Sequence, residues 1–196
     1  MSAGGRLLAL HRQQLRLNWR LRVHNICAST ETELSRWLAQ DVCPPVAVLS
    51  RRQRHGQGQH GRHWQSPNGG LWLSAAVAWP SQHQLPAAQG LPRLLVTALA
   101  AELAPLGLTL GDPLRIKPPN DLMVGERRLA GVLTAIAWRG AAVRHLRFGI
   151  GLNGRHPIRP PGISLEQLLG SACPPWEGLV GVGMRALERL VLDSPT

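Results

Sequence analysis

The sequence predicts one α+β domain, in which a mixed, largely antiparallel sheet is flanked by helices. Two patterns lead to this class. Short stretches of alternating apolar residues, such as Leu71 to Val77, indicate strands, and longer stretches with apolar residues three and four positions apart indicate separate helices. A chain of 196 residues, 44% of them apolar, can bury one substantial core, and this length favours one domain over two.

The N-terminal part of the chain divides into a leader and the start of the domain. Residues 1–23 are rich in arginine and leucine and are interpreted as a basic leader, with a peripheral strand or helix as the alternative. Residues 24–196 make up the predicted domain. Within it, Thr30 followed by Glu33 matches a capping box, so a helix is expected from Thr30 to about Gln40.

The rest of the chain alternates between predicted strands and helices. A strand containing Val46 and Val48 leads into a glycine-rich loop, and the strand from Leu71 to Val77 follows that loop. Apolar spacing then predicts a helix from about Pro92 to Leu106 and an amphipathic helix from about Glu177 to Leu192. The other expected strands are 114–116, a buried strand at 131–138, and 143–150, with turns at 125–126 and 139–140.

The composition excludes several classes of protein. No stretch approaches the roughly 18 consecutive apolar residues of a membrane span, and a secretory signal is not recognisable at the N-terminus. Three cysteines without a CxxC pair predict neither a disulfide framework nor a zinc site, which favours the cytoplasm. The net charge of +11 raises the question of nucleic acid, but the arginines are scattered and no nucleic-acid-binding motif accompanies them. We therefore expect no membrane partner and no specific nucleic-acid partner.

Lysine occurs only once among the 22 basic residues, at Lys117. A lysine ammonium is a compact point charge, whereas the arginine guanidinium is a planar fork. A chain that otherwise uses arginine would keep one lysine where the chemistry requires an ammonium. Chance retention at the surface is the alternative, and composition alone leaves the two open.

The segment from Gly56 to Gly61 holds three glycines in six positions. Such a segment lets backbone N–H groups surround an anion, so it is a candidate phosphate loop. An ordinary flexible surface loop would have the same glycine content. Trp64 and the SPNGG turn that follow favour an ordered lid, and the GK[ST] ending of a Walker loop is missing.

Several segments, taken in order, resemble the biotin protein ligase family. They are AST at 28–30, Gln53, the glycine-rich loop ending in GRHW, GGLWLS at 69–74, KPPNDL at 117–122, RLAGVL at 128–133 and GIGLN at 149–153. The resemblance covers roughly residues 24–153 and lies in the order and spacing of the motifs. It implies the mixed sheet with flanking helices of that family, which is related to the class II aminoacyl-tRNA synthetases and to lipoate ligases.

The resemblance also implies an activity. Members of the family use ATP with Mg²⁺ to convert biotin into biotinyl-5'-AMP, and then pass the biotin to a lysine of a biotin carboxyl carrier protein, as in acetyl-CoA carboxylase. The expected ligands are therefore biotin, ATP and Mg²⁺, and the expected partner is the carrier protein. A monomer and a homodimer are both compatible with the sequence.

Site residues follow by matching this sequence to the family motifs. Lys117 is the candidate catalytic residue, because it would lie between the biotin carboxylate and the α-phosphate. The residues matched to biotin are Ser29, Thr30, Gln53, Gln57, Gly58, Gln59, Lys117 and Gly131. Those matched to the nucleotide are Gly56, Gly58, Gly61, Arg62, Trp64, Asn120, Asp121 and Asn153, and no protein residue is assigned to a metal. Helix capping by Ser29 and Thr30 and a loop-supporting role for Gln53 remain alternatives.

The sequence also departs from the family pattern. Gln57 and Gln59 stand where basic residues often hold the phosphate, and Pro118 and Ala135 replace the usual tryptophan and acid. The small C-terminal β-barrel of many ligases and an N-terminal helix-turn-helix are not recognisable in the sequence. A lipoate or octanoate transferase of the same superfamily and a catalytically weakened biotin-binding relative are therefore kept as alternatives to a ligase.

Overall fold

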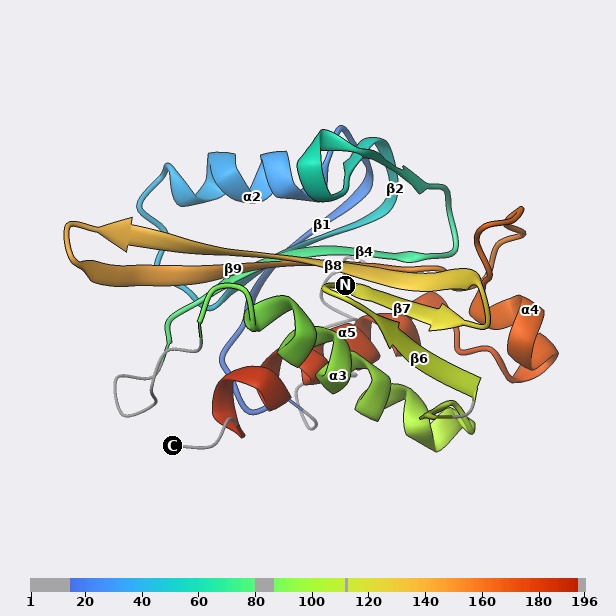
Figure 1. Cartoon of the computed structure of the whole chain (residues 1–196). Coiled ribbons are helices and arrows are strands. Elements are labelled where there is room, and N and C mark those ends of the chain that lie inside the picture. The colour runs from blue at the N-terminus through green and yellow to red at the C-terminus, as the bar shows by residue number, and fades with distance from the viewer. Residues whose placement is uncertain (1–14, 80–86, 112, 194–196) are drawn as a thin grey trace.

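The fold is a large mixed sheet with helices on both faces (Figure 1). The computed structural model describes residues 15–79, 87–111 and 113–193. Its nine strands follow the order β1-β2-β4-β9-β8-β7-β6-β5, and β3 pairs with the end of β2. The β1–β2 and β5–β6 pairs are parallel, whereas the other pairs are antiparallel. The α+β class predicted from the sequence is confirmed.

The strands differ in length according to their place in the sheet. The long central strands are β2, β8 and β9, whereas β5 and β7 are short. Their bounds are β1 Arg20–Cys27, β2 Val46–Gln57, β3 His63–Ser66, β4 Leu71–Val77, β5 Thr109–Leu110, β6 Pro113–Lys117, β7 Asp121–Val124, β8 Arg127–Arg139 and β9 Ala142–Leu152.

Helices cover the two faces of the sheet unequally. Helix α2 lies on one face, whereas α3 and α5 pack together on the other (Figure 1). The main core lies between the sheet and the α3–α5 pair, and a smaller one lies under α2, where Leu34 and Trp37 meet Val46 and Val48. The bounds are α2 Thr30–Leu38, α3 Leu91–Leu103, α4 Leu165–Leu169 and α5 Trp176–Leu192.

Two local expectations are changed by the structure. The N-cap of α2 is Ser29, whose side chain accepts a hydrogen bond from Glu31 N, and not Thr30. The Thr30 hydroxyl is instead engaged by Gln53 and Ser74. In addition, the 131–138 strand is not buried along its length: only Val132 is buried, and Trp138 near the far end of β8 is 56% exposed.

The expected boundary between leader and domain falls inside strand β1. Residues 20–23 pair with β2 and are part of the sheet, while residues 1–14 of the leader lie outside the described residues. The stretch before β1 is fixed by Glu188 of α5, which accepts hydrogen bonds from Arg16 N, Leu17 N and the indole Nε1 of Trp19. This stretch therefore packs against the domain.

None of the helices in the described ranges combines the length and the apolar character that a bilayer crossing requires.

Candidate functional site

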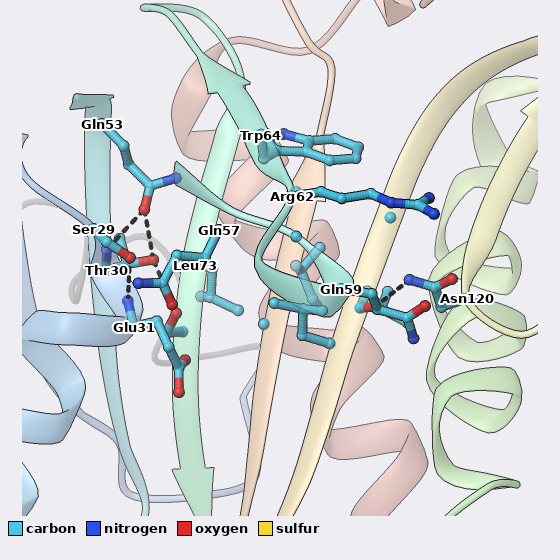
Figure 2. A pocket seen from close by; sticks show the side chains of 18 of the residues that line it. Ser29, Thr30, Glu31, Gln53, Gln57, Gln59, Arg62, Trp64, Leu73 and Asn120 are labelled. Carbon is cyan, nitrogen blue, oxygen red and sulfur yellow. Dashed lines mark hydrogen bonds between the residues drawn. The ribbon is translucent and has the colours of Figure 1, made fainter. Parts of the chain in front are cut away.

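A pocket opens between the N-terminus of α2, the β2–β3 connection and strands β8 and β9 (Figure 2). We call it the Thr30 pocket. It collects most of the residues singled out in the sequence, namely Ser29, Thr30, Gln53, Gln57, Gly58, Gln59, Arg62, Trp64, Asn120, Asp121 and Gly131. Residues far apart in the chain thus meet around one cavity.

One wall of the Thr30 pocket is a continuous set of hydrogen bonds. Gln53 Oε1 accepts from Thr30 N at 2.7 Å and from Thr30 Oγ1 at 3.0 Å, as Figure 2 shows. Thr30 Oγ1 also lies 2.9 Å from Ser74 Oγ. Since Thr30 uses its one hydroxyl proton toward Gln53, Ser74 must donate to Thr30. The orientation of the Thr30 hydroxyl is therefore fixed.

The same set of bonds continues from Gln53 to strand β3. Gln53 Nε2 donates to Ser66 Oγ at 2.8 Å, and Ser66 Oγ donates to Trp64 O at 3.2 Å. Gln53 is thus held at both ends of its amide, and its second Nε2 proton remains for a ligand. Ser29 adds a hydroxyl proton, because as helix cap it only accepts from Glu31 N. The wall offers N–H and O–H donors, which suit a carbonyl oxygen.

The glycine-rich segment is partly strand and partly turn. Gly56 still belongs to β2, and a Cβ there would lie 2.4 Å from both Ser66 Oγ and Trp64 O, so β2 and β3 approach closely only because this residue is glycine. A short 3₁₀ turn follows at Gln59–Gly61, with Gly61 at φ +72°. Neither Gly56 nor Gly61 lines the pocket, whereas Gly58 between them does. The first and last glycines shape the segment rather than bound the cavity.

Trp64 closes one side of the cavity against two glycines. Gly131 of β8 and Gly151 of β9 are paired across the strands. A Cβ at Gly131 would lie 3.0 Å from Trp64 Cζ3, and one at Gly151 would lie 2.8 Å from Trp64 Cε2. The indole therefore lies against bare backbone, which explains why both strands carry glycine there.

A second opening, the Asn153 pocket, lies on the other side of Trp64. His63, Trp64 and Arg128 line both pockets. Lys117 and Asn153 line the Asn153 pocket and not the Thr30 pocket. Lys117 is exposed at the end of β6 and directly faces Asp121 across the β6–β7 pair. The lone lysine therefore stands near the junction of the two cavities.

Asn153 is buried and held by its amide nitrogen, which donates to Arg128 O at 3.2 Å and to Ile163 O at 3.0 Å. Its Oδ1 is buried without a protein partner. A buried acceptor of this kind is expected to bind a donor from water or from a ligand. Asn153 therefore offers the second pocket a fixed hydrogen-bond acceptor.

Asp121 and Arg128 form the charged centre of the junction. Arg128 NH2 lies 2.9 Å from Asp121 Oδ2, and the Arg128 guanidinium lies 5.8 Å from the centre of the Trp64 ring. Burial raises the pKa of Asp121 above its ordinary value, whereas Arg128, Lys117 and Arg62 act in the opposite direction. Three cations thus surround one partly desolvated carboxylate.

The described residues show no cluster of metal-ligating side chains. No group of three His, Cys, Asp or Glu side chains gathers anywhere in the described ranges. Asp121 is already paired with Arg128. Asn120, expected at the nucleotide, donates its amide to Val132 O at 2.8 Å and so links the start of β7 to β8, and it also lines the Thr30 pocket.

Sequence reasoning missed several residues of the site. Arg128 lines both pockets, and Ser66 and Ser74 complete the hydrogen-bonded wall, yet none of them was assigned a role. Arg128 had a signal, since it opens the RLAGVL motif as the charged start of an otherwise apolar strand. Ser74 closes the GGLWLS motif, but only the pairing of β2 with β3 and β4 brings Ser66 and Ser74 to the Thr30–Gln53 pair.

Comparisons with known proteins agree with one another. The model of the biotin/lipoate A/B protein ligase family matches residues 24–153. The chain is 34% identical over 108 residues to the bifunctional ligase/repressor BirA of Escherichia coli. The matched residues cover 55% of this chain and 32% of that protein. It is 32% identical over 152 residues to the biotin–[acetyl-CoA-carboxylase] ligase of Paracoccus denitrificans, with 72% of this chain and 61% of that protein covered.

The same fold occurs in solved structures. The biotin protein ligase from Aquifex aeolicus, solved in complex with biotin and ATP, superposes with a TM-score of 0.69 and 27% identity, covering 87% of this chain and 70% of that one. The chain spans about a third of the E. coli relative and about three fifths of the P. denitrificans relative. The likeness therefore concerns part of longer proteins.

Proposed function

Because the chain belongs to the biotin/lipoate A/B protein ligase family, we propose that it is a biotin protein ligase that forms biotinyl-5'-AMP and transfers biotin to a carrier protein. The observation that carries the proposal is the pair of adjoining pockets separated by Trp64. One offers a wall of hydrogen-bond donors, and the other offers unpaired cations and a buried acceptor. The donors suit the carbonyl of a small ureido ring, and the cations and the acceptor suit the phosphates and the base of a nucleotide.

Biotin would occupy the Thr30 pocket. Ser29 and Gln53 would donate to the ureido carbonyl, and Leu73 and Ile150 would contact its apolar part. Gly131 lines this pocket and would act through Trp64, whose indole packs against its bare backbone and closes the cavity around the ring. The donors toward the ureido oxygen also distinguish biotin from lipoate, whose dithiolane ring has no carbonyl to accept them. The wall therefore favours biotin over a lipoate or octanoate group.

The nucleotide would occupy the Asn153 pocket, with its α-phosphate at the junction. Asn153 Oδ1 would accept from the exocyclic amino group of adenine, and Arg62, Arg128 and the Gly58 segment would surround the phosphate. Arg62 and Arg128 thus supply positive charge that Gln57 and Gln59 do not. The substitutions in the loop are for this reason compatible with activity.

Lys117 would carry the chemical step. A biotin carboxylate oxygen attacks the α-phosphorus, pyrophosphate leaves, and the acyl carbon becomes bonded to a good leaving group. Two anions must approach for this, and an ammonium between them lowers their repulsion and stabilises the charge that develops on the phosphate. In the second step a carrier lysine amine attacks the acyl carbon, and AMP leaves.

Magnesium would enter with ATP rather than through a protein site. It would neutralise phosphate charge when bound. Because Asp121 is paired with Arg128 and no ligand cluster exists in the described ranges, we assign the ion no protein ligand.

Partner and location extend the proposal further. The acceptor would be the biotin carboxyl carrier protein of acetyl-CoA carboxylase, and the described cysteines Cys27, Cys43 and Cys173 are free thiols, which suits the cytoplasm. We propose no nucleic-acid partner, no membrane partner, and a monomer or homodimer.

The test separates a ligase from a binding protein. Biotin is titrated by calorimetry with and without a non-hydrolysable ATP analogue. Biotin should bind more tightly when the analogue is present, because the analogue has then already ordered the glycine-rich segment that biotin would otherwise have to order. Biotin, ATP and Mg²⁺ should release pyrophosphate, and intact mass should show a biotin adduct on a carrier domain. Unchanged biotin affinity together with no pyrophosphate would instead identify a binding protein.

A further inference from the structure

Positive charge is distributed unevenly over the described part of the chain. Every described aspartate and glutamate pairs with an arginine, except Glu188, which accepts three N–H donors. Several exposed basic side chains are left without an ion pair or a hydrogen bond in the described ranges, and they are Arg52, Arg54, Arg62, Arg93, Lys117, Arg139 and Arg159.

Three of these seven unpaired cations line the two openings of the site. Arg62 lines the Thr30 pocket, and Lys117 and Arg159 line the Asn153 pocket. The phosphates of a nucleotide account for cations at those two openings. Arg52 and Arg54 line neither pocket, so the nucleotide leaves them unexplained.

Arg52 and Arg54 line a third depression, which we call the Arg52 groove. They are two residues apart on β2 and therefore project to the same side of the strand. His63 lines this groove and both pockets, and Gln53 and Ser66 of the hydrogen-bonded wall also border it. The groove thus runs into the junction where biotin and the nucleotide would meet.

We infer that the Arg52 groove is the docking surface for the acidic flank of the acceptor protein. The inference rests on the proposed function. An acceptor lysine must bring its amine to the acyl carbon at the junction, and a lysine side chain extends only a few bonds from its backbone. The acceptor surface must therefore cover the rim that carries Arg52 and Arg54.

Charge favours an acidic partner at this rim. Two guanidinium groups without a counter-ion repel each other and attract carboxylates, and charges at an interface rim raise the rate of encounter and select the partner. Among the described residues, no aspartate or glutamate lines the Arg52 groove. An acceptor with glutamates or aspartates beside its target lysine would supply the missing counter-ions.

The experiment compares two charge reversals. Arg52→Glu/Arg54→Glu removes the groove cations, whereas Arg93→Glu/Arg139→Glu reverses unpaired arginines that line none of the three openings and serves as the matched control. Binding of a biotin carboxyl carrier domain is measured directly by fluorescence anisotropy at two salt concentrations. Transfer of biotin to the same domain gives its KM.

We expect the groove reversal to raise the Kd and the KM for the carrier domain about tenfold and to flatten their salt dependence, with the control near wild type. Pyrophosphate release without the carrier should remain unchanged in both variants. Changing the carrier's acids next to its lysine to glutamine should weaken wild-type binding and strengthen binding to the reversed variant, because it removes the repulsion between like charges. Equal carrier affinity in all three proteins would overturn the inference.

Two further outcomes are separable. If the wild-type protein releases no pyrophosphate, the proposed function is wrong. The anisotropy measurement then still tests whether the carrier domain docks on the Arg52 groove. A 20-base-pair DNA duplex is titrated in parallel. If the groove reversal abolishes duplex binding and leaves carrier binding intact, the groove is a nucleic-acid surface and the inference is wrong.

Discussion

The Thr30 pocket and the Asn153 pocket differ in how completely their polar groups are satisfied. On the Thr30 side, the amide of Gln53 and the hydroxyls of Thr30 and Ser66 are held by one another. On the Asn153 side, Lys117 is exposed and unpaired, and Asn153 Oδ1 is buried without a partner. Trp64 separates the two.

This difference indicates different ways of binding. A pocket whose donors are already oriented loses little conformational freedom when a neutral ring enters. A cavity rimmed by unpaired cations binds through charge, and its segments become ordered when an anion neutralises them. The first pocket would set the specificity for biotin, and the second would supply the electrostatic stabilisation for its activation.

The largest effect is expected at Lys117. Lys117→Arg keeps the charge but replaces a point charge with a wide planar fork that cannot occupy the space between two anions. We expect pyrophosphate release to fall by about 100-fold or more, in line with the loss of one group that stabilises developing charge. Biotin binding without ATP should be unchanged, because Lys117 does not line the Thr30 pocket. A rate near that of wild type would show that the lone lysine is incidental.

Arg128 lies on the boundary between the two pockets, so its removal should affect both. We expect Arg128→Gln to slow pyrophosphate release about thirtyfold, since a charge-assisted hydrogen bond contributes about 1.5–3 kcal/mol. The control is Arg127→Gln, which removes the neighbouring arginine. Arg127 donates to Gly162 O and lines neither pocket. Equal losses in the two variants would point to a general effect on β8.

Arg128→Gln also tests how the Asp121 carboxyl titrates. Burial raises its pKa, so the native carboxyl keeps its proton to a higher pH than the unfolded chain does. The free energy of unfolding therefore falls as the pH rises from the ordinary to the raised pKa. Removing Arg128, the largest opposing charge, should raise this pKa further and extend the fall to higher pH. Denaturant unfolding between about pH 4 and 7 measures how the free energy of unfolding changes with pH, and Asp121→Asn should remove this pH dependence.

A smaller effect is expected from the wall of the Thr30 pocket. Ser66→Ala leaves Gln53 Nε2 without its partner, so the amide is no longer held in the orientation that presents its second N–H to biotin. We expect biotin to bind about tenfold more weakly, or by about 1.4 kcal/mol. Ser50→Ala is the matched control, because Ser50 is a buried serine of β2 that donates to Arg52 O and lines none of the pockets. ATP affinity measured alone should change in neither variant. Equal weakening by both substitutions would deny Ser66 a specific role.

The sequence predicted what local patterns determine. Apolar periodicity located α2, α3, α5 and the long strands to within a few residues. It did not reveal β3, because four residues after a glycine turn have too short a pattern, nor β7, which directly follows the KPPN turn. Both strands exist through pairing with long neighbours, which only tertiary structure supplies.

For the site, the sequence motifs identified the residues and the fold determined their grouping. Ser29, Thr30 and Gln53 were assigned together and do line one pocket. Lys117 was matched to biotin and lines the neighbouring cavity, which shares His63, Trp64 and Arg128 with the Thr30 pocket. The biotin and nucleotide roles of individual residues remain predictions.

The smallest effect is expected from restoring a cation to the glycine-rich segment. Gln57 lines the Thr30 pocket together with Arg62, so Gln57→Arg would add a charged donor near the phosphate of bound biotinyl-5'-AMP. A charge-assisted hydrogen bond exceeds a neutral one by about 1 kcal/mol, which corresponds to about fivefold slower dissociation of the adenylate.

Dissociation of the adenylate is measured for wild type, Gln57→Arg and Arg62→Ala at two salt concentrations, because exposed charges are screened. If Gln57→Arg has no effect while Arg62→Ala accelerates dissociation, Arg62 already supplies the charge. The positive charge near the phosphate would then come from Arg62, five residues further along the chain than Gln57, and the electrostatic difference between the two pockets would rest on Lys117 and Arg159 of the Asn153 pocket.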